Sequence, residues 1–240
     1  MSSEQFDFQQ FSIQQDRCAM KVGIDAVILG ASAEIPSFCY QALDIGSGTG
    51  VLALMLAQRS PSTAIDAIEL DEDSAAQSAE NVANSPFAEQ ITVYQGTVQG
   101  FRSKQSYDLI VCNPPYFNSG APSPDPARAQ ARHTESLPHS ELLTSVGRLL
   151  NPSGIFWTIL PFNTHIRFVQ LANSVHLKPV KQIRVAQRPG EIPNRVVLGF
   201  QRAGSRLKMD TLTIRTKSSS AYTRQFDTLT APFYLSHPSK

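Results

Sequence analysis

Cysteine is scarce in this chain, and the few cysteines are not spaced as a disulfide framework or a zinc site would require. Only three occur in 240 residues, at Cys18, Cys39 and Cys112, and each stands among apolar or strand-like neighbours. Disulfide-stabilised secreted domains and zinc sites depend on paired or clustered cysteines. The pattern therefore predicts a cytoplasmic protein that binds no metal.

Long apolar runs are absent as well. A membrane-spanning helix needs about 18 or more apolar residues in a row, and the chain has no such stretch. The amino terminus also lacks a basic region followed by an apolar one, so we expect neither secretion nor a membrane partner. With 41% apolar residues, the 240-residue chain is long enough for one α/β domain with a large core.

Acidic residues are nearly missing from the last third of the chain. Residues 161–240 carry 13 Lys and Arg against 3 Asp and Glu, a net charge of +10, whereas residues 1–160 carry 8 against 17, a net charge of −9. A basic end of this kind predicts a polyanionic partner. The alternative is that these basic side chains are spread around the surface and contact only solvent.

Short apolar runs alternate with helical patterns through the middle of the chain. Patterns typical of strands occupy residues 42–45, 64–69, 91–94, 107–112, 155–160, 180–185 and 196–200, and patterns typical of helices occupy 51–59, 73–84, 139–150 and 164–174. Strands that alternate with helices imply right-handed parallel crossovers. The predicted fold class is therefore α/β, a doubly wound, mostly parallel sheet of seven strands with helices on both faces.

We predict one domain, with a core at residues 41–203 and an extension at each end. In the first extension, residues 1–40, an apolar alternation between Phe6 and Ile13 suggests a hairpin, and Asp25 can cap a short helix. The second extension, residues 204–240, is basic and aromatic.

Asn113-Pro114-Pro115-Tyr116 follows the predicted strand at residues 107–112, which places an asparagine at the carboxyl end of a strand. The two prolines fix φ near −65° and remove two backbone donors. The Asn113 side-chain oxygen and the Pro114 carbonyl are then rigid acceptors for the two hydrogens of a primary amine on a ring or acyl group. Tyr116 offers a flat face on which a base can stack. The alternative is that these residues form a turn without a catalytic role.

A glycine-rich turn, Asp44-Ile45-Gly46-Ser47-Gly48-Thr49-Gly50, joins the first core strand to its helix. Glycines there let the backbone approach a nucleotide-like ligand outside the strand ends. Glu69, nineteen residues after Gly50, ends the second strand, where its carboxylate can accept from both ribose hydroxyls. A dinucleotide fingerprint requires glycine where Val51 stands, and Asp44 would repel a pyrophosphate but suits an ammonium group. The pattern favours S-adenosylmethionine as the cofactor.

These residues resemble the class I S-adenosylmethionine-dependent methyltransferases, with Asn113 to Tyr116 as the tetrapeptide of amino-methyltransferases. More closely, the chain resembles the bacterial tRNA(Val) adenine-37 N6-methyltransferases, in residues 15–26, in residues 128–134 and in two aromatic segments near the carboxyl end. The resemblance implies transfer of a methyl group to the exocyclic N6 amine of a tRNA adenine, next to the anticodon.

The motifs, the charge distribution and the resemblance together assign residues to roles. The predicted catalytic residues are Asn113, Pro114 and Tyr116. The predicted cofactor-binding residues are Asp44, Gly46, Ser47, Gly48, Gly50, Glu69, Leu70, Thr97, Lys21 and Gly23, of which the last two belong to a segment that covers the cofactor. The predicted substrate-binding residues are Pro115, Phe117, Arg128, Arg132, His133, Arg188 and Arg195. Many relatives place an acid after the third strand to hold the cofactor adenine, but residues 95–98 contain none, so backbone groups or Thr97 are expected to do so.

Two other functions fit part of the pattern. A protein glutamine amide makes the same demand of the tetrapeptide as an adenine amine does, but enzymes that methylate it usually add a helical amino-terminal domain. Here about forty residues precede Asp44, and they are strand-like. A catalytically silent RNA-binding protein with this fold is the other alternative, although it would not need Asp44, Glu69 and Asn113.

Overall fold

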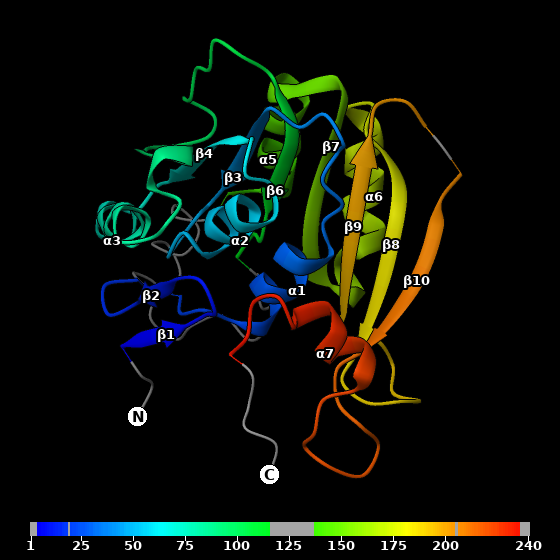
Figure 1. Ribbon diagram of the computed structural model, residues 1–240. Coiled ribbons are helices and arrows are strands. Elements are labelled where there is room, and N and C mark those ends of the chain that lie inside the picture. The colour runs from blue at the N-terminus through cyan, green and yellow to red at the C-terminus, as the bar shows by residue number, and fades with distance from the viewer. Residues whose placement is uncertain (1–3, 19, 116–136, 205, 236–240) are drawn as a thin grey trace, which may run out of the picture.

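An eight-stranded sheet forms the centre of the protein in the computed structural model, which describes residues 4–18, 20–115, 137–204 and 206–235 (Figure 1). The strand order is β10-β8-β9-β7-β6-β3-β4-β5. The strands are β3 (Gln41–Ile45), β4 (Ala64–Glu69), β5 (Ile91–Gln95), β6 (Tyr107–Cys112), β7 (Leu150–Pro161), β8 (Lys178–Ala186), β9 (Arg195–Gln201) and β10 (Lys208–Thr213). All neighbouring strands are parallel except β9, which is antiparallel to both β7 and β8.

Helices cover both faces of this sheet. The larger apolar cluster joins one face to α1 (Ile24–Ser32), α2 (Val51–Arg59) and α7 (Arg224–Thr230), and the second cluster joins the other face to α5 (His139–Leu149) and α6 (His165–Ser174). Side chains of β7 alternate between the clusters, so Trp157 packs in the first and Phe156 in the second. The remaining helices are α3 (Glu72–Ala83) and the short η1 (Ala88–Gln90) and η2 (Phe162–Thr164). The predicted doubly wound α/β fold is confirmed.

The number of strands differs from the sequence prediction, which gave seven. The additional strand is β10, which pairs with β8 in parallel from Lys208 opposite Lys181 to Thr213 opposite Ala186. Only Leu212 of β10 is buried, so the strand lacks the apolar pattern of the inner strands. Part of the stretch predicted as a carboxyl-terminal extension therefore continues the central sheet.

The amino-terminal hairpin predicted from the sequence is present. Its strands β1 (Gln5–Asp7) and β2 (Ser12–Gln14) are antiparallel, and Phe8, Phe11 and Ile13 are buried against the main body. Phe8 also forms a backbone bridge with Tyr234 and stacks on its ring. The two ends of the described chain therefore lie side by side (Figure 1).

The predicted cap of the first helix is wrong. Helix α1 begins at Ile24, its N-cap is Gly23, and no side chain caps it. Asp25 lies within the first turn, and its Oδ2 accepts a hydrogen bond from Arg195 Nε of β9 at 2.9 Å. The Asp25 carboxylate, which the local sequence predicts to cap the helix, thus pairs instead with the half-buried Arg195 guanidinium. None of the described helices is long and apolar enough to cross a membrane.

Candidate active site at the carboxyl edge of the sheet

The predicted site residues follow directly from the carboxyl ends of β3, β4 and β6, which lie at one edge of the sheet, called here the carboxyl edge. Ile45 of β3 pairs with Ile68 of β4 on one side and with Cys112 of β6 on the other. Gly46 and Asn113 therefore come next on adjacent strands, which lie about 5 Å apart. The fold brings together the glycine-rich turn, Glu69 and Asn113, which are far apart in sequence.

The glycine-rich turn requires glycine at three positions. Gly46, Gly48 and Gly50 have φ values of 71°, 53° and 82°, which L side chains rarely adopt. A Cβ atom at Gly46 or Gly48 would meet no atom within 4 Å, whereas one at Gly50 would lie 2.7 Å from Ser78 Oγ. The first two glycines therefore expose backbone to open space that a ligand can approach, and the third lets α3 pack closely.

Asp44 is a fully buried carboxylate at the end of β3, and neither of its oxygens has a hydrogen-bond partner in the structure. Burial raises the pKa of Asp44 to about 7, with a smaller contribution from the Glu69 carboxylate. The Ala53 amide in the first turn of α2 partly offsets this rise but completes no hydrogen bond. A buried carboxylate that the described residues compensate only in part fits a ligand that brings an ammonium group.

Glu69 holds the turn in place from the end of β4. Its Oε2 accepts from the Gly48 amide at 2.8 Å, and its Oε1 accepts from the Asp71 amide at 3.0 Å. Asp71 in turn caps α3 by accepting from the Ser74 amide at 2.9 Å, so this helix begins one residue before the predicted start. The Glu69 carboxylate is therefore fixed beside the glycine-rich turn, as a ribose ligand has to be.

The Asn113 motif follows β6, which neighbours β3, the strand of Asp44; β4, which ends at Glu69, is the next strand beyond β3. Asn113 is half-buried and Pro114 is buried, while Pro115 is exposed. Burial raises the pKa of the preceding Cys112 thiol, and the charges of Asp44 and Glu69 raise it further. Tyr116, Phe117, Arg128, Arg132 and His133, all predicted site residues, lie outside the described residues.

At the end of β5, the groups available to a cofactor are backbone atoms and uncharged side chains. Gly96 has a φ of 147°, and a Cβ atom there would meet no atom within 4 Å. Thr97 is exposed, and its Oγ1 accepts from the Gly100 amide at 3.1 Å. Gln95 Nε2 donates to the carbonyl of Leu70, another predicted cofactor residue, at 3.1 Å. We expect backbone groups or Thr97 to hold the cofactor adenine. The open space beside the Gly96 backbone fits this expectation.

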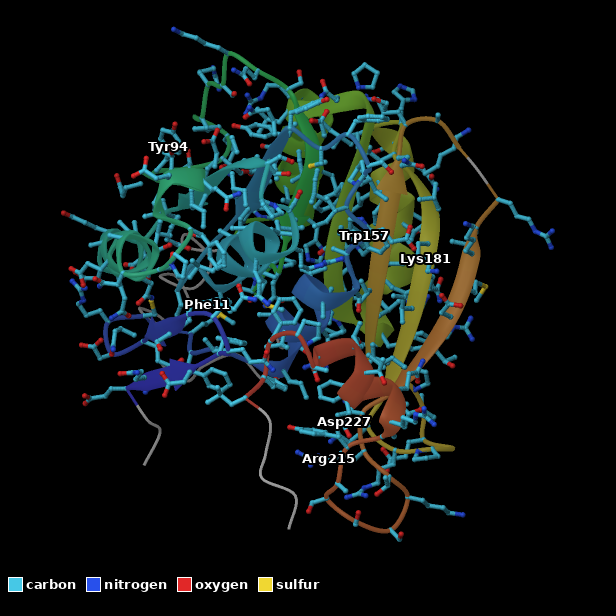
Figure 2. All side chains as sticks on the ribbon, viewed as in Figure 1. Phe11, Tyr94, Trp157, Lys181, Arg215 and Asp227 are labelled. Atoms are coloured by element: carbon cyan, nitrogen blue, oxygen red, sulfur yellow. The ribbon has the colours of Figure 1, made fainter. Side chains whose placement is uncertain are left out.

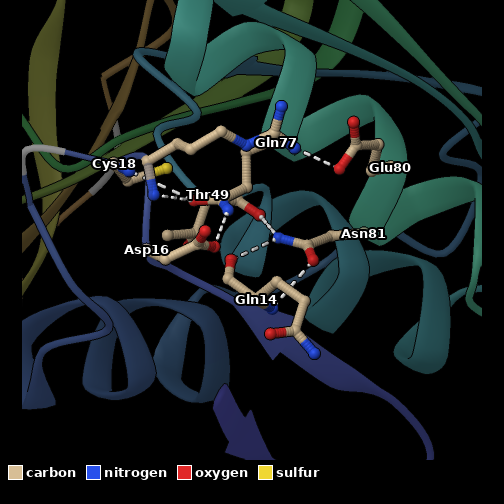
Figure 3. A network of polar contacts seen from close by, with 8 residues as sticks. Gln14, Asp16, Cys18, Thr49, Gln77, Glu80 and Asn81 are labelled. Atoms are coloured by element: carbon tan, nitrogen blue, oxygen red, sulfur yellow. Dashed lines mark hydrogen bonds and ion pairs between the residues drawn. The ribbon is translucent and has the colours of Figure 1, made fainter. Parts of the chain in front are cut away.

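Two buried amides of α3, Gln77 and Asn81, were missed by the sequence analysis (Figure 3). Asn81 Nδ2 donates to the carbonyls of Gln14 and Thr49, both at 2.9 Å, and its Oδ1 accepts from the Gln14 amide at 2.8 Å. Because Thr49 belongs to the glycine-rich turn, Asn81 joins that turn to the end of the hairpin. Polar residues on a helix are usually solvated, so no local pattern indicates this role.

Gln77 fixes the residues that follow the hairpin. Its Oε1 accepts from the amides of Arg17 and Cys18, both at 3.1 Å, and its Nε2 donates to Asp16 Oδ1 at 2.5 Å. Burial raises the pKa of the Cys18 thiol, and the Glu69 carboxylate adds to the rise. This segment, residues 14–18, therefore lies beside the end of β4. Lys21 and Gly23, predicted to cover the cofactor, are exposed between this segment and α1.

Of the basic residues predicted to contact substrate, the two that the structure describes, Arg188 and Arg195, have partners within the chain. Arg195 forms the ion pair with Asp25, which compensates its charge. Arg188 Nη1 donates to the carbonyls of Thr216 and Ser219, both at 2.7 Å. Those acceptors are neutral, so they do not compensate the positive charge of Arg188. Within the part of the chain that the structure describes, no three His, Cys, Asp or Glu residues are grouped as a metal site would require.

Comparisons with known proteins agree with this geometry. Residues 33–178 match the model of the methyltransferase small domain family. A protein of Flavobacterium psychrophilum named tRNA1(Val) (adenine(37)-N6)-methyltransferase is 40% identical over 96% of this chain and 99% of its own length. A protein of the same name from Aeromonas hydrophila is 42% identical over 96% of this chain and 97% of its own length.

Solved structures resemble the fold at low sequence identity. A predicted O-methyltransferase of Agrobacterium tumefaciens has a TM-score of 0.70 at 17% identity, covering 87% of this chain and 96% of its own. A glycopeptide N-methyltransferase solved with S-adenosylmethionine has a TM-score of 0.55 at 12% identity, covering 75% of this chain and 95% of its own.

Proposed function

Because the chain belongs to the family of the tRNA1(Val) (adenine(37)-N6)-methyltransferases, within the methyltransferase small domain family, we propose that it methylates the exocyclic N6 amine of adenine-37 in tRNA(Val). The observation that carries the proposal is the carboxyl edge, where an uncompensated buried Asp44, a fixed Glu69 and Asn113 follow from three adjacent strands.

The residues of the glycine-rich turn fit S-adenosylmethionine. Asp44 binds its ammonium group, directly or through water, and Glu69 accepts from its ribose hydroxyls. Gly46 and Gly48, with open space in front of them, allow the cofactor to approach the backbone. When bound, S-adenosylmethionine supplies a methyl group on a positively charged sulfonium, which is already an activated leaving group.

The target amine is held by Asn113 and Pro114. The Asn113 side-chain oxygen and the Pro114 carbonyl accept its two hydrogens and orient the nitrogen toward the methyl donor, which is catalysis by positioning. No strong base is needed, because the amine becomes acidic as the new bond forms and its proton can pass to these acceptors or to water. A base inside a tRNA loop has to leave its stack to reach this site, and Tyr116 is proposed to stack on it.

Transfer of a radiolabelled methyl group tests this function directly. The purified protein and labelled S-adenosylmethionine are incubated with tRNA(Val) transcript, with the same transcript carrying guanine at position 37, and with total cell protein. We expect label in the first substrate alone. Label in protein and not in tRNA would favour glutamine methylation, and no label in any substrate would favour a catalytically silent RNA-binding protein.

A further inference from the structure

The fold sorts the basic residues of the last third of the chain between two opposite edges of the sheet. Strands β8 and β10 run in the same direction as β6 and β7, so the loops that follow them, residues 187–194 and 214–222, lie at the carboxyl edge with Asn113. Figure 1 shows these loops side by side at the ends of β8 and β10, and Arg215 lies there in Figure 2. The opposite edge carries Lys178, Arg202, Arg206 and Lys208.

At the end of β8 and in the two loops, four basic residues have no acidic partner among the described residues; they are Arg184, Arg188, Arg215 and Lys217, called here the basic edge. Arg224, exposed at the start of α7, is a fifth base nearby. Arg188 and Arg215 donate only to backbone carbonyls, and Lys217 is exposed. The salt bridges of the described residues involve none of the four. The nearby acids are Glu191 in the first loop and Asp227 in α7, so the basic edge keeps a net positive charge.

Arg184 is the least satisfied of the four. Its Nε is buried without a hydrogen-bond partner, and its guanidinium carbon lies 5.8 Å from the centre of the Phe162 ring. Phe162 directly follows β7, the neighbour of β6 in the sheet. An arginine that contacts an aromatic ring but no acceptor is well suited to bind an anion.

The two loops are fixed before any ligand binds. Arg188 of the first loop donates to Thr216 and Ser219 of the second. The backbone amide of Arg215 donates to the Gln187 carbonyl at 2.9 Å. The Arg215 guanidinium also lies 4.9 Å from the centre of the Tyr222 ring. A preorganised positive surface loses little conformational freedom when it binds.

The carboxyl edge is therefore divided by charge, and Asn113 lies at the division. The cofactor side carries Asp44, Glu69 and Asp71 at the ends of β3 and β4, and the other side carries the basic edge. With about 4.8 Å between strands, β8 lies about 14 Å from β6, and β10 about 19 Å from it. An RNA strand whose target base enters at Asn113 is repelled by one side and attracted by the other.

We propose that the basic edge binds the phosphates of the RNA strand that leads away from the target nucleotide, across β7, β9, β8 and β10. This inference rests on the proposed function, because it requires an RNA substrate. It excludes the basic residues of the opposite edge from the contact, although they contribute equally to the net charge of the chain.

Two exposed lysines near opposite ends of β10 give a matched test. Lys217 follows the strand at the carboxyl edge, and Lys208 begins it at the opposite edge. Lys217→Gln and Lys208→Gln each remove one positive charge from an exposed position, so an effect of net charge alone is equal in both. Affinity for tRNA(Val) transcript is measured from 0.05 to 0.3 M salt, together with S-adenosylmethionine affinity and melting temperature.

We expect Lys217→Gln to lower the log-log salt slope by about 0.7, the value for one single-strand phosphate contact, which is about fivefold in affinity at 0.1 M salt. Lys208→Gln should match the wild type, and Arg184→Gln should repeat the effect of Lys217→Gln. Equal losses in the two lysine variants, or no loss in either, would overturn the basic edge while wild-type methylation of tRNA still stands. A wild type that transfers no methyl group to tRNA would instead refute the proposed function.

Discussion

At the scale of single residues, Asn113 is proposed to act in methyl transfer and not in cofactor binding. Its side-chain oxygen is proposed to act on the target amine at transfer, so its removal affects the transition state and not the cofactor. Asn113→Ala should reduce kcat for tRNA methylation by about 100-fold or more, the size of effect seen when one preorganised hydrogen-bonding group is removed from an active site. S-adenosylmethionine affinity, measured by calorimetry, should stay at the wild-type value. A variant with wild-type kcat would exclude Asn113 from catalysis.

Glu69 is expected to act on the cofactor. Glu69→Gln keeps the shape of the side chain but removes a charged acceptor, which is worth about 1.5 to 3 kcal/mol for hydrogen bonds to a charged group. The dissociation constant for S-adenosylmethionine should rise about ten- to hundredfold. The matched control is Glu72→Gln, which removes the same charge from an exposed position three residues later. Equal effects in both variants would mean that Glu69 is not the ribose ligand.

Asp44 should make cofactor binding depend on pH. Its pKa in the folded chain is raised to about 7 by burial, and an ammonium group binds only the ionised carboxylate. Affinity should therefore fall about tenfold per pH unit below pH 7 and level off above it. Calorimetric titration between pH 5.5 and 8 measures this. Asp44→Asn should bind weakly at every pH, and an unchanged affinity across this range in the wild type would contradict the assignment.

The same raised pKa affects stability in the opposite sense. The folded protein binds the Asp44 proton more tightly than the unfolded chain, whose pKa is near the ordinary value of 3.8. The contribution of Asp44 to the free energy of unfolding is therefore fully present below that value and is lost as the pH rises to about 7. Cofactor binding and folding thus place opposite demands on one side chain, as functional sites often do.

At the scale of structural elements, Asn81 joins three segments that local sequence does not relate. Asn81→Ala leaves the Thr49 carbonyl and both backbone groups of Gln14 without their partner, at a cost of about 1 to 3 kcal/mol in the free energy of unfolding. S-adenosylmethionine affinity should fall as well, because Thr49 belongs to the glycine-rich turn. Denaturant unfolding and calorimetry measure the two effects.

Asn84→Ala is the control for this prediction, because Asn84 is exposed at the end of the same helix. Its free energy of unfolding should lie within about 0.5 kcal/mol of the wild type, as is usual for surface positions. If Asn81→Ala lost stability but bound S-adenosylmethionine normally, the network would be structural only and the segment at residues 14–18 would not influence the site.

At the scale of the whole molecule, the uneven charge along the sequence becomes an uneven charge in space, but only in part. Part of the positive charge of the last third is compensated within the fold, since Lys181 pairs with Glu34 and Asp210, and Arg195 pairs with Asp25. The remainder divides between the two sheet edges according to strand direction. Only the part at the carboxyl edge lies near Asn113, which is why net charge alone does not identify the substrate surface.

The sequence by itself determined the central elements, and it predicted which residues form the site. The bounds predicted for α2, β4 and β6 are the observed ones, because continuous apolar runs and clear helical periodicity are local signals. The glycine-rich turn, Glu69 and the Asn113 motif were likewise readable, because each depends on residue types at fixed spacing after a strand.

The tertiary structure decided what depends on contacts between distant segments. Strand β10 is mostly exposed, and only its pairing with β8 shows that it belongs to the central sheet. Asp25, expected to cap a helix, instead pairs with an arginine 170 residues away. Gln77 and Asn81 are buried by the amino-terminal segment and not by their own helix. The direction of β8 and β10 in the sheet decides which basic residues lie on the same edge as the active site. Strand direction is a property of the assembled sheet, and no local sequence pattern encodes it.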